Sequence, residues 1–277
     1  MSALASPTAP APEEPLHRLT MAGWLRFAGR TAAMMLLLVI CVTLDSLWRL
    51  LGGGRVWPRR FMTGVVWLSG VRITVSGKRE SGRELILANH VSWIDIPVIG
   101  SVTGCAFVAH DGLTAIPLLH WICRRNDTVF VARHDRTSVG GQIDQVRLAL
   151  DDTGALALFP EGTTSDGTGL LPFKSSLLSA IEPVPQGVVV QPALLDYGTE
   201  AADLAWVGEE HGAVNFRRIL SRRTPVCVTL CFLPVLRGPE LANRKSMAAA
   251  AQTAIGDELT RRRAMPPPGS SPQRVTL

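Results

Sequence analysis

Short apolar runs alternate with helical segments along most of the chain. Runs with the length and flanks of buried strands span residues 84–88, 104–109, 128–132, 155–159, 187–194 and 226–233. Helical segments are expected between them, at residues 113–123, 142–152, 177–181 and 239–263. This alternation predicts an α/β fold with a mixed sheet flanked by helices, and polar chemistry in such folds gathers at strand ends.

The N-terminal part of the chain has a different pattern. Residues 31–44 form a nearly unbroken apolar segment with arginines on both sides, and a second apolar stretch spans residues 61–75. The first segment is shorter than the about 20 residues that cross a bilayer squarely, although Trp24 and Trp48 could extend it at the interface. We expect a hydrophobic helical membrane anchor. Three forms stay open: a span, a hairpin set into one leaflet, and a long buried core helix.

Composition supports contact with lipid. Apolar residues make up 47% of the 277 residues and charged residues only 18%, and the mean hydropathy is +0.21. The net charge of +5 favours an anionic membrane surface or a phosphorylated ligand, whereas the few aromatic residues do not support nucleic-acid binding. The five cysteines are scattered, which favours free thiols in a reducing cytoplasm. We expect no metal or other cofactor.

The first candidate site is the segment Asn-His-Val-Ser-Trp-Ile-Asp at residues 89–95. It follows a predicted strand, and Pro97 suits the first turn of a helix that begins here. Within a helix His90 and Asp95 would point about 140° apart, whereas on a turn that enters a helix they can meet. A carboxylate on one ring nitrogen leaves the other free to accept a proton, as in a general base. The alternative is an ordinary surface or core pair.

The second candidate site is the segment Pro-Glu-Gly-Thr-Thr-Ser-Asp-Gly at residues 160–167, directly after the predicted strand 155–159. Glycines and hydroxyl residues in such a turn expose backbone N–H groups that can hold a phosphate or another oxyanion, although the segment can equally be only a loop. Arg133 and Lys174 add positive charge to the same rim. Three strand ends are therefore predicted to converge.

These segments resemble, in order and spacing, the glycerolipid (lysophospholipid) acyltransferase family, which includes 1-acylglycerol-3-phosphate acyltransferases. Residues 89–95 are similar to the family's His-x4-Asp block, and residues 129–133 to its second block, which ends in arginine. Residues 159–163 and 189–192 are similar to its third and fourth blocks. The resemblance covers roughly residues 85–234. It also fits the apolar N-terminal segment, because the family's substrates reside in membranes.

The resemblance implies that a fatty acyl group passes directly from acyl-CoA or acyl carrier protein to the hydroxyl of a membrane lysolipid, without an acyl-enzyme and without a metal. It implies that His90 is the general base and that Asp95 orients it and stabilises its charge. The residues implied to bind or shape the acceptor site are Asn89, Arg133, Glu161, Gly162, Thr163, Thr164 and Lys174.

Two departures from the family pattern leave the acceptor open. Thr164 stands where many members carry arginine, and a hydroxyl cannot replace the bidentate grip of a guanidinium on phosphate. His110 stands where the family often has lysine. We expect lysophosphatidate as the acceptor because Arg133 and Lys174 remain, and lyso-ornithine lipid is the alternative. A thioester or phosphoester hydrolase, or a noncatalytic lipid-binding protein, would also fit the residues alone.

The sequence divides into four parts. Residues 1–15 and 265–277 are predicted to be disordered tails, residues 16–80 a hydrophobic membrane-anchoring helical region, and residues 81–264 the acyltransferase catalytic domain. The expected location is a bacterial inner membrane, with the catalytic domain facing the cytoplasm.

Overall fold

A computed structural model describes residues 19–80, 82–110, 117–126, 128–131, 139–208 and 210–264. The strands in these residues form one sheet in the order β1-β7-β6-β2-β5-β3-β4. Five neighbouring strands, from β6 to β4, run parallel, while β7 is antiparallel to β6 and pairs in parallel with β1. The strands are β1 (Val71–Ser76), β2 (Arg83–Ala88), β3 (Ala106–His110), β4 (Val129–Val131), β5 (Ala155–Leu158), β6 (Val188–Asp196) and β7 (Val226–Phe232). The predicted mixed α/β sheet is confirmed.

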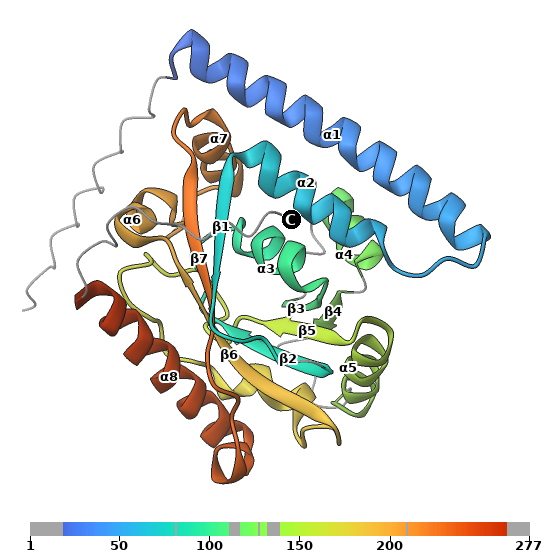
Figure 1. The fold of residues 1–277 in the computed structure, drawn as a ribbon, viewed down its shortest axis with the longest axis vertical. Helices are drawn as coiled ribbons and strands as arrows, with labels where there is room; N and C mark the ends of the chain where they lie inside the picture. The colour runs from blue at the N-terminus through green and yellow to red at the C-terminus, as the bar shows by residue number, and fades with distance from the viewer. Residues whose placement is uncertain are drawn as a thin grey trace, which may run out of the picture.

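Helices cover both faces of the sheet, as the alternation of side chains along a strand requires. Leu85 and Leu87 of β2 point into one core cluster, and Ile86 and Ala88 point into the other. The first cluster is completed by α5 (Val139–Thr153), the 3-10 segment Ser175–Ile181 and α8 (Arg244–Ala264). The second is completed by α2 (Trp57–Ser69), α3 (Asp95–Thr103), α6 (Ala201–Leu204) and α7 (Gly212–Ser221). Figure 1 shows these layers on either side of the sheet.

The helix α1 (Met21–Leu50) runs along the outside of the second layer, past α7, α2 and α4 (Pro117–Arg125) (Figure 1). Near its start the Arg26 guanidinium donates to the Ser221 carbonyl at 2.9 Å, and near its end Asp45 pairs with Arg125 at 3.0 Å. Its outward side is apolar and exposed, with Leu25 at 68% and Leu36 at 61% exposure. It is therefore not a buried core helix. By length and composition it is long and apolar enough to cross a membrane.

The second apolar stretch, residues 61–75, is not one helix. The helix α2 ends at Ser69, Gly70 adopts the left-handed conformation with φ 74°, and the chain then enters β1. The boundary predicted at residue 80 is consequently too late, because β1 pairs in full register with β7 of the same sheet. The two predicted tails, residues 1–15 and 265–277, lie outside the described residues.

Candidate active site

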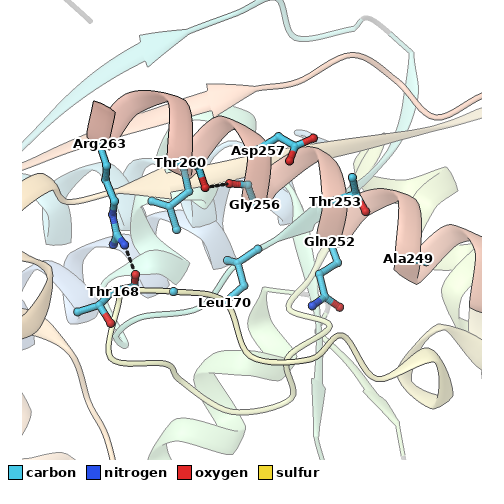
Figure 2. A pocket seen from close by; sticks show the side chains of 11 residues that line it. Thr168, Leu170, Ala249, Gln252, Thr253, Gly256, Asp257, Thr260 and Arg263 are labelled. Carbon is cyan, nitrogen blue, oxygen red and sulfur yellow. Dashed lines mark hydrogen bonds between the residues drawn. The ribbon is translucent and has the colours of Figure 1, made fainter. Parts of the chain in front are cut away.

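A groove of about 500 Å³ lies between α8 and the loop at residues 168–170. Figure 2 shows Arg263 reaching across it to that loop, where the guanidinium donates to the carbonyls of Thr168 and Gly167, the latter at 2.6 Å. The described residues that line the groove include none of those predicted to act in catalysis or binding. The polar residues that the sequence singles out and that the structure describes lie elsewhere, most of them at the carboxyl ends of β2 and β5.

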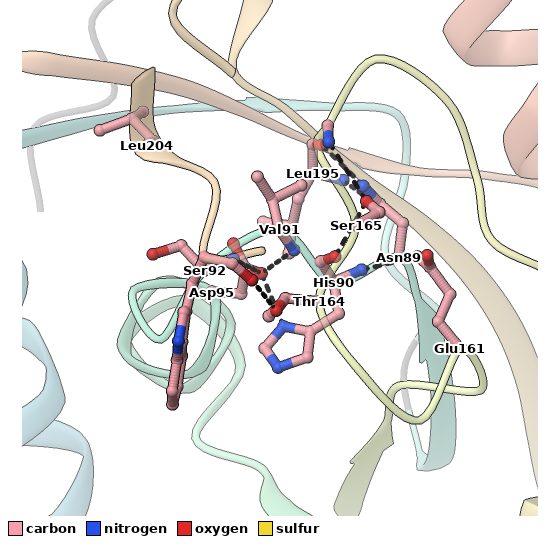
Figure 3. A network of polar contacts seen from close by, with 12 residues as sticks. Asn89, His90, Val91, Ser92, Asp95, Glu161, Thr164, Ser165, Leu195 and Leu204 are labelled. Atoms are coloured by element: carbon pink, nitrogen blue, oxygen red, sulfur yellow. Dashed lines mark hydrogen bonds and ion pairs between the residues drawn. The ribbon is translucent and has the colours of Figure 1, made fainter. Parts of the chain in front are cut away.

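His90 and Asp95 meet at the junction between β2 and α3. Asp95 is the first residue of α3, and His90 lies on the turn before it, so the Nδ1 atom of the ring comes within 2.8 Å of the Asp95 Oδ2 atom. The ring stacks on Phe159 with centroids 4.1 Å apart, which fixes its plane. Figure 3 shows the imidazole directed away from the strand. The side chain of His90 is 17% exposed. Since Nδ1 is engaged by the carboxylate, Nε2 is the nitrogen able to accept a proton from a ligand.

The Asp95 carboxylate is fully buried and surrounded by donors. Its Oδ2 atom also accepts the backbone N–H groups of Val91 at 2.6 Å and Ser92 at 2.9 Å. The hydroxyl of Tyr197, the residue that follows β6, donates to the Oδ1 atom. These donors hold the Asp95 carboxylate in place beside the Nδ1 atom of His90, where it can orient the ring and balance a positive charge on it.

Glu161 and Asn89 hold the backbone around His90. The Glu161 carboxylate is fully buried and bridges two N–H donors, from His90 at 2.9 Å and Leu171 at 2.9 Å (Figure 3). The Asn89 amide, predicted to bind the acceptor, instead pairs with both backbone groups of Leu195 in β6, at 2.7 and 3.1 Å. Both side chains therefore fix the position of the turn that carries His90, and their polar atoms are engaged within the protein.

Glu161 is expected to make stability depend on pH. Burial raises the pKa of its carboxyl from 4.5 to about 7, against the opposing effect of its two N–H donors. Between these values the folded state keeps a proton that the unfolded state has lost, so this contribution to stability is full below pH 4.5 and is lost as the pH rises through about 7. The loss amounts to about 3 kcal/mol. The free energy of unfolding is measured by urea denaturation at several pH values for wild type and for Glu161→Gln, whose side chain cannot titrate. If the difference in unfolding free energy between the two proteins did not vary with pH, this role of Glu161 would be contradicted.

The remaining predicted residues lie on the loop after β5 or nearby. Gly162 has a φ of 69°, and a Cβ there would lie 3.0 Å from Leu177 and 3.3 Å from the Lys174 ammonium, so the turn requires glycine and brings Lys174 to its rim. Thr163 is exposed. The Thr164 hydroxyl donates to the Trp206 carbonyl, which turns it toward the protein. Arg133 lies outside the described residues.

Two residues of this site were not predicted from the sequence. Tyr197, the residue after β6, contacts Asp95, and the fully buried Asn215 of α7 accepts a hydrogen bond from the Ser92 hydroxyl at 3.2 Å. Asn215 also donates to the carbonyls of Leu204 and Ala205 at 3.2 and 3.1 Å, which ties α7 to the segment before it. Only the position of Tyr197, directly after a strand that ends at the same edge of the sheet, offered a signal.

Comparison with known proteins identifies the family. A sequence model described as "Acyltransferase" matches residues 72–196. The lyso-ornithine lipid O-acyltransferase of Rhodobacter capsulatus is 30% identical over 264 residues, which cover 89% of this chain and 93% of that protein. The chain belongs to the acyltransferase family. It is an enzyme of that family. The match to the family model begins within β1, the strand that the predicted domain boundary at residue 80 had left outside the catalytic domain.

Other relatives of this acyltransferase are named for one of two acceptors, lyso-ornithine lipid or 1-acyl-sn-glycerol-3-phosphate. The lyso-ornithine lipid O-acyltransferase of Rhizobium meliloti is 38% identical over 185 residues, covering 64% of this chain and 63% of that protein. The 1-acyl-sn-glycerol-3-phosphate acyltransferase of Neisseria gonorrhoeae is 37% identical over 99 residues, covering 35% of this chain and 39% of that protein. A crystal structure of the 1-acyl-sn-glycerophosphate acyltransferase PlsC from Thermotoga maritima shares the fold, with a TM-score of 0.52 and 21% identity over 85% of this chain and 98% of that one.

Proposed function

We propose that this acyltransferase transfers a fatty acyl group from a thioester donor to the hydroxyl of lyso-ornithine lipid, with His90 as general base. The observation that carries the assignment of the base is the 2.8 Å contact of His90 Nδ1 with the buried Asp95 carboxylate. The Nε2 atom of His90 takes the proton of the acceptor hydroxyl while the hydroxyl oxygen attacks the thioester carbonyl carbon. The tetrahedral intermediate then expels the thiolate, and the thiolate takes the proton from His90.

The acceptor is proposed from two features. The match to the lyso-ornithine lipid O-acyltransferase of Rhodobacter capsulatus covers 89% of the chain, whereas the match to the 1-acyl-sn-glycerol-3-phosphate acyltransferase of Neisseria gonorrhoeae covers 35%. The hydroxyl of Thr164, at the position where the family pattern often has arginine, donates to Trp206 and adds no charge for a phosphate. The ornithine head carries a carboxylate and an ammonium in place of a phosphate. This reverses the order of acceptors expected from the sequence, and lysophosphatidate becomes the second candidate because Lys174 remains on the rim.

A competition experiment tests the acceptor. The purified acyltransferase in anionic vesicles receives labelled acyl-CoA or acyl carrier protein with equal amounts of lyso-ornithine lipid and lysophosphatidate. We expect ester formation mainly on lyso-ornithine lipid. Phosphatidate as the main product would make lysophosphatidate the acceptor, and acylation of neither lipid with either donor would reject the proposed function. We expect chelators to have no effect on the rate, because a thiolate is a good leaving group that needs no metal.

The helix α1 is proposed to lie in one leaflet of the inner membrane, with the catalytic domain on the cytoplasmic side. The helix is tied to the domain near both ends, through Arg26 and Asp45, so the domain accompanies it along about 29 Å of its length. A perpendicular span would carry the polar domain into hydrocarbon, which is costly. With α1 parallel to the surface, its exposed apolar side enters the leaflet and the domain stays in water.

Glutamates on the outward side of α1 are expected to weaken membrane binding. Leu36 and Val39, which are 61% and 60% exposed, lie one turn apart on that side. The Leu36→Glu/Val39→Glu variant should bind anionic vesicles at least about tenfold more weakly in sedimentation, because two apolar side chains no longer enter lipid. The matched control is Leu148→Glu, at an equally exposed leucine of α5 on the other side of the sheet. Equal binding of both variants would contradict this orientation of α1.

A further inference from the structure

The two oxygens of the Asp95 carboxylate have unequal surroundings. Three N–H donors crowd Oδ2, from His90, Val91 and Ser92. Among the described residues, the partner recorded for Oδ1 is the Tyr197 hydroxyl. A carboxylate that the turn holds at one oxygen can still rotate. The contact at the other oxygen therefore determines the orientation of the carboxylate and how its negative charge is distributed between the two oxygens.

Tyr197 is buried in the core, where its hydroxyl contacts Asp95. Its side chain is only 4% exposed, and it lies directly after β6, whose last residues pair with β7. Asp196 accepts the Gly198 N–H at 2.9 Å, which fixes the turn that begins at this residue. Burial, together with the nearby Asp95 charge, raises the pKa of Tyr197 well above 10, so the ring keeps its proton and remains a donor.

We propose that Tyr197 is a positioning residue that sets the orientation and charge of Asp95 and thereby the strength of His90 as a base. The proposal rests on the proposed function of His90. A hydroxyl that donates to Asp95 draws negative charge away from the His90 side of the carboxylate. Without it, the carboxylate presents more negative charge to the ring, the protonated imidazole is stabilised, and a higher pH is needed to obtain the neutral base.

Other ionisable groups face the same pair. Glu161 reaches the His90 backbone from the loop after β5, and its charge acts on both His90 and Asp95. Lys174 approaches Gly162 on the same loop. On the α7 side, Glu210 accepts from Asn215 and Arg218 at 3.3 and 2.9 Å, so its contacts are with that network rather than with the catalytic pair. Tyr197 is the one of these groups that touches the Asp95 carboxylate.

The test is the dependence of kcat on pH for Tyr197→Phe in vesicles. We expect kcat to fall roughly tenfold at neutral pH, KM for the acceptor to stay within about twofold, and the acidic limb of the profile to move up by about half a pH unit. Thr103→Val is the matched control, since it removes a buried hydroxyl from the far end of α3, where it contacts Ile99 and Cys105. The control should leave the acidic limb in place.

Because Tyr197 is the single tyrosine in the chain, replacing all tyrosine by 3-fluorotyrosine changes this position alone. The fluorinated ring is the more acidic and stronger donor, so the acidic limb should move down, opposite to the effect of Tyr197→Phe. Unchanged limbs in both proteins, or the same shift in Thr103→Val, would overturn this inference. If His90→Ala is inactive in the same assay, only the inference about Tyr197 fails; if His90→Ala is active, the proposed function fails.

Discussion

The His90→Ala variant is expected to lose about 10²–10⁴-fold in kcat while it stays folded and bound to the membrane. Its imidazole is the group that we propose takes the proton of the acceptor hydroxyl, and alanine leaves the attack on the thioester to an unassisted alcohol. The ring contributes little to the core, since it is partly exposed and stacks on Phe159. KM for the acceptor should therefore change little. Initial rates with a thioester donor and lysolipid vesicles measure both constants.

His120→Ala is the matched control for this variant. His120 lies on α4 and packs against Phe130 with ring centroids 5.1 Å apart, where it faces an aromatic ring in place of a carboxylate. Its removal should leave kcat within about twofold, because packing at a distance from the reacting atoms does not enter the proton transfer. A His90→Ala enzyme as active as this control would show that another group acts as the base.

The Asp95→Asn variant should lower kcat by roughly 10²–10³-fold with little change in structure. The N–H groups of Val91 and Ser92 hold an acceptor at the Oδ2 position, so the amide oxygen should stay there and the amide nitrogen should face Tyr197. The tautomer of His90 is then retained, and what is lost is charge. A unit charge about 4 Å from the imidazolium contributes about 4 kcal/mol at an effective dielectric constant of 20, less the part screened by water.

Asp151→Asn provides the control for loss of a carboxylate. Asp151 pairs with Arg83 at 2.6 Å on the surface at the end of α5, and its side chain is 57% exposed. An exposed pair of this kind contributes little, so both stability and kcat should match wild type. If Asp95→Asn were also to match wild type in kcat, the buried carboxylate would have no part in stabilising the protonated His90.

Much of the fold follows from local pattern. The run at residues 84–88 is apolar on both faces because β2 lies in the middle of the sheet, with helices on either side. The stretch at residues 61–75 was misread for a related reason. A short apolar helix and a short apolar strand look alike by composition, and what separates them is Gly70 together with pairing to β7, about 150 residues away in the chain.

The candidate site was predictable as far as its motif extends. His90 and Asp95 are neighbours in the chain, so a junction between strand and helix was enough to bring them together. The contacts of the Asn89 and Thr164 side chains were not predictable, because their hydrogen-bond partners Leu195 and Trp206 lie in distant parts of the sequence. Tyr197 and Asn215 were missed for the same reason. An isolated tyrosine or asparagine forms no sequence motif from which a contact with a residue more than 100 positions away could be predicted.

The most direct test of the central claim is the fate of a labelled acyl group. Wild type and His90→Ala are each given acyl thioester and vesicles that contain lyso-ornithine lipid, and the lipids and free thiol are followed together. The account predicts that wild type forms one ester on the lysolipid for each thiol released, and that His90→Ala forms almost none. Free fatty acid in place of the ester, or equal ester formation by the two proteins, would contradict it.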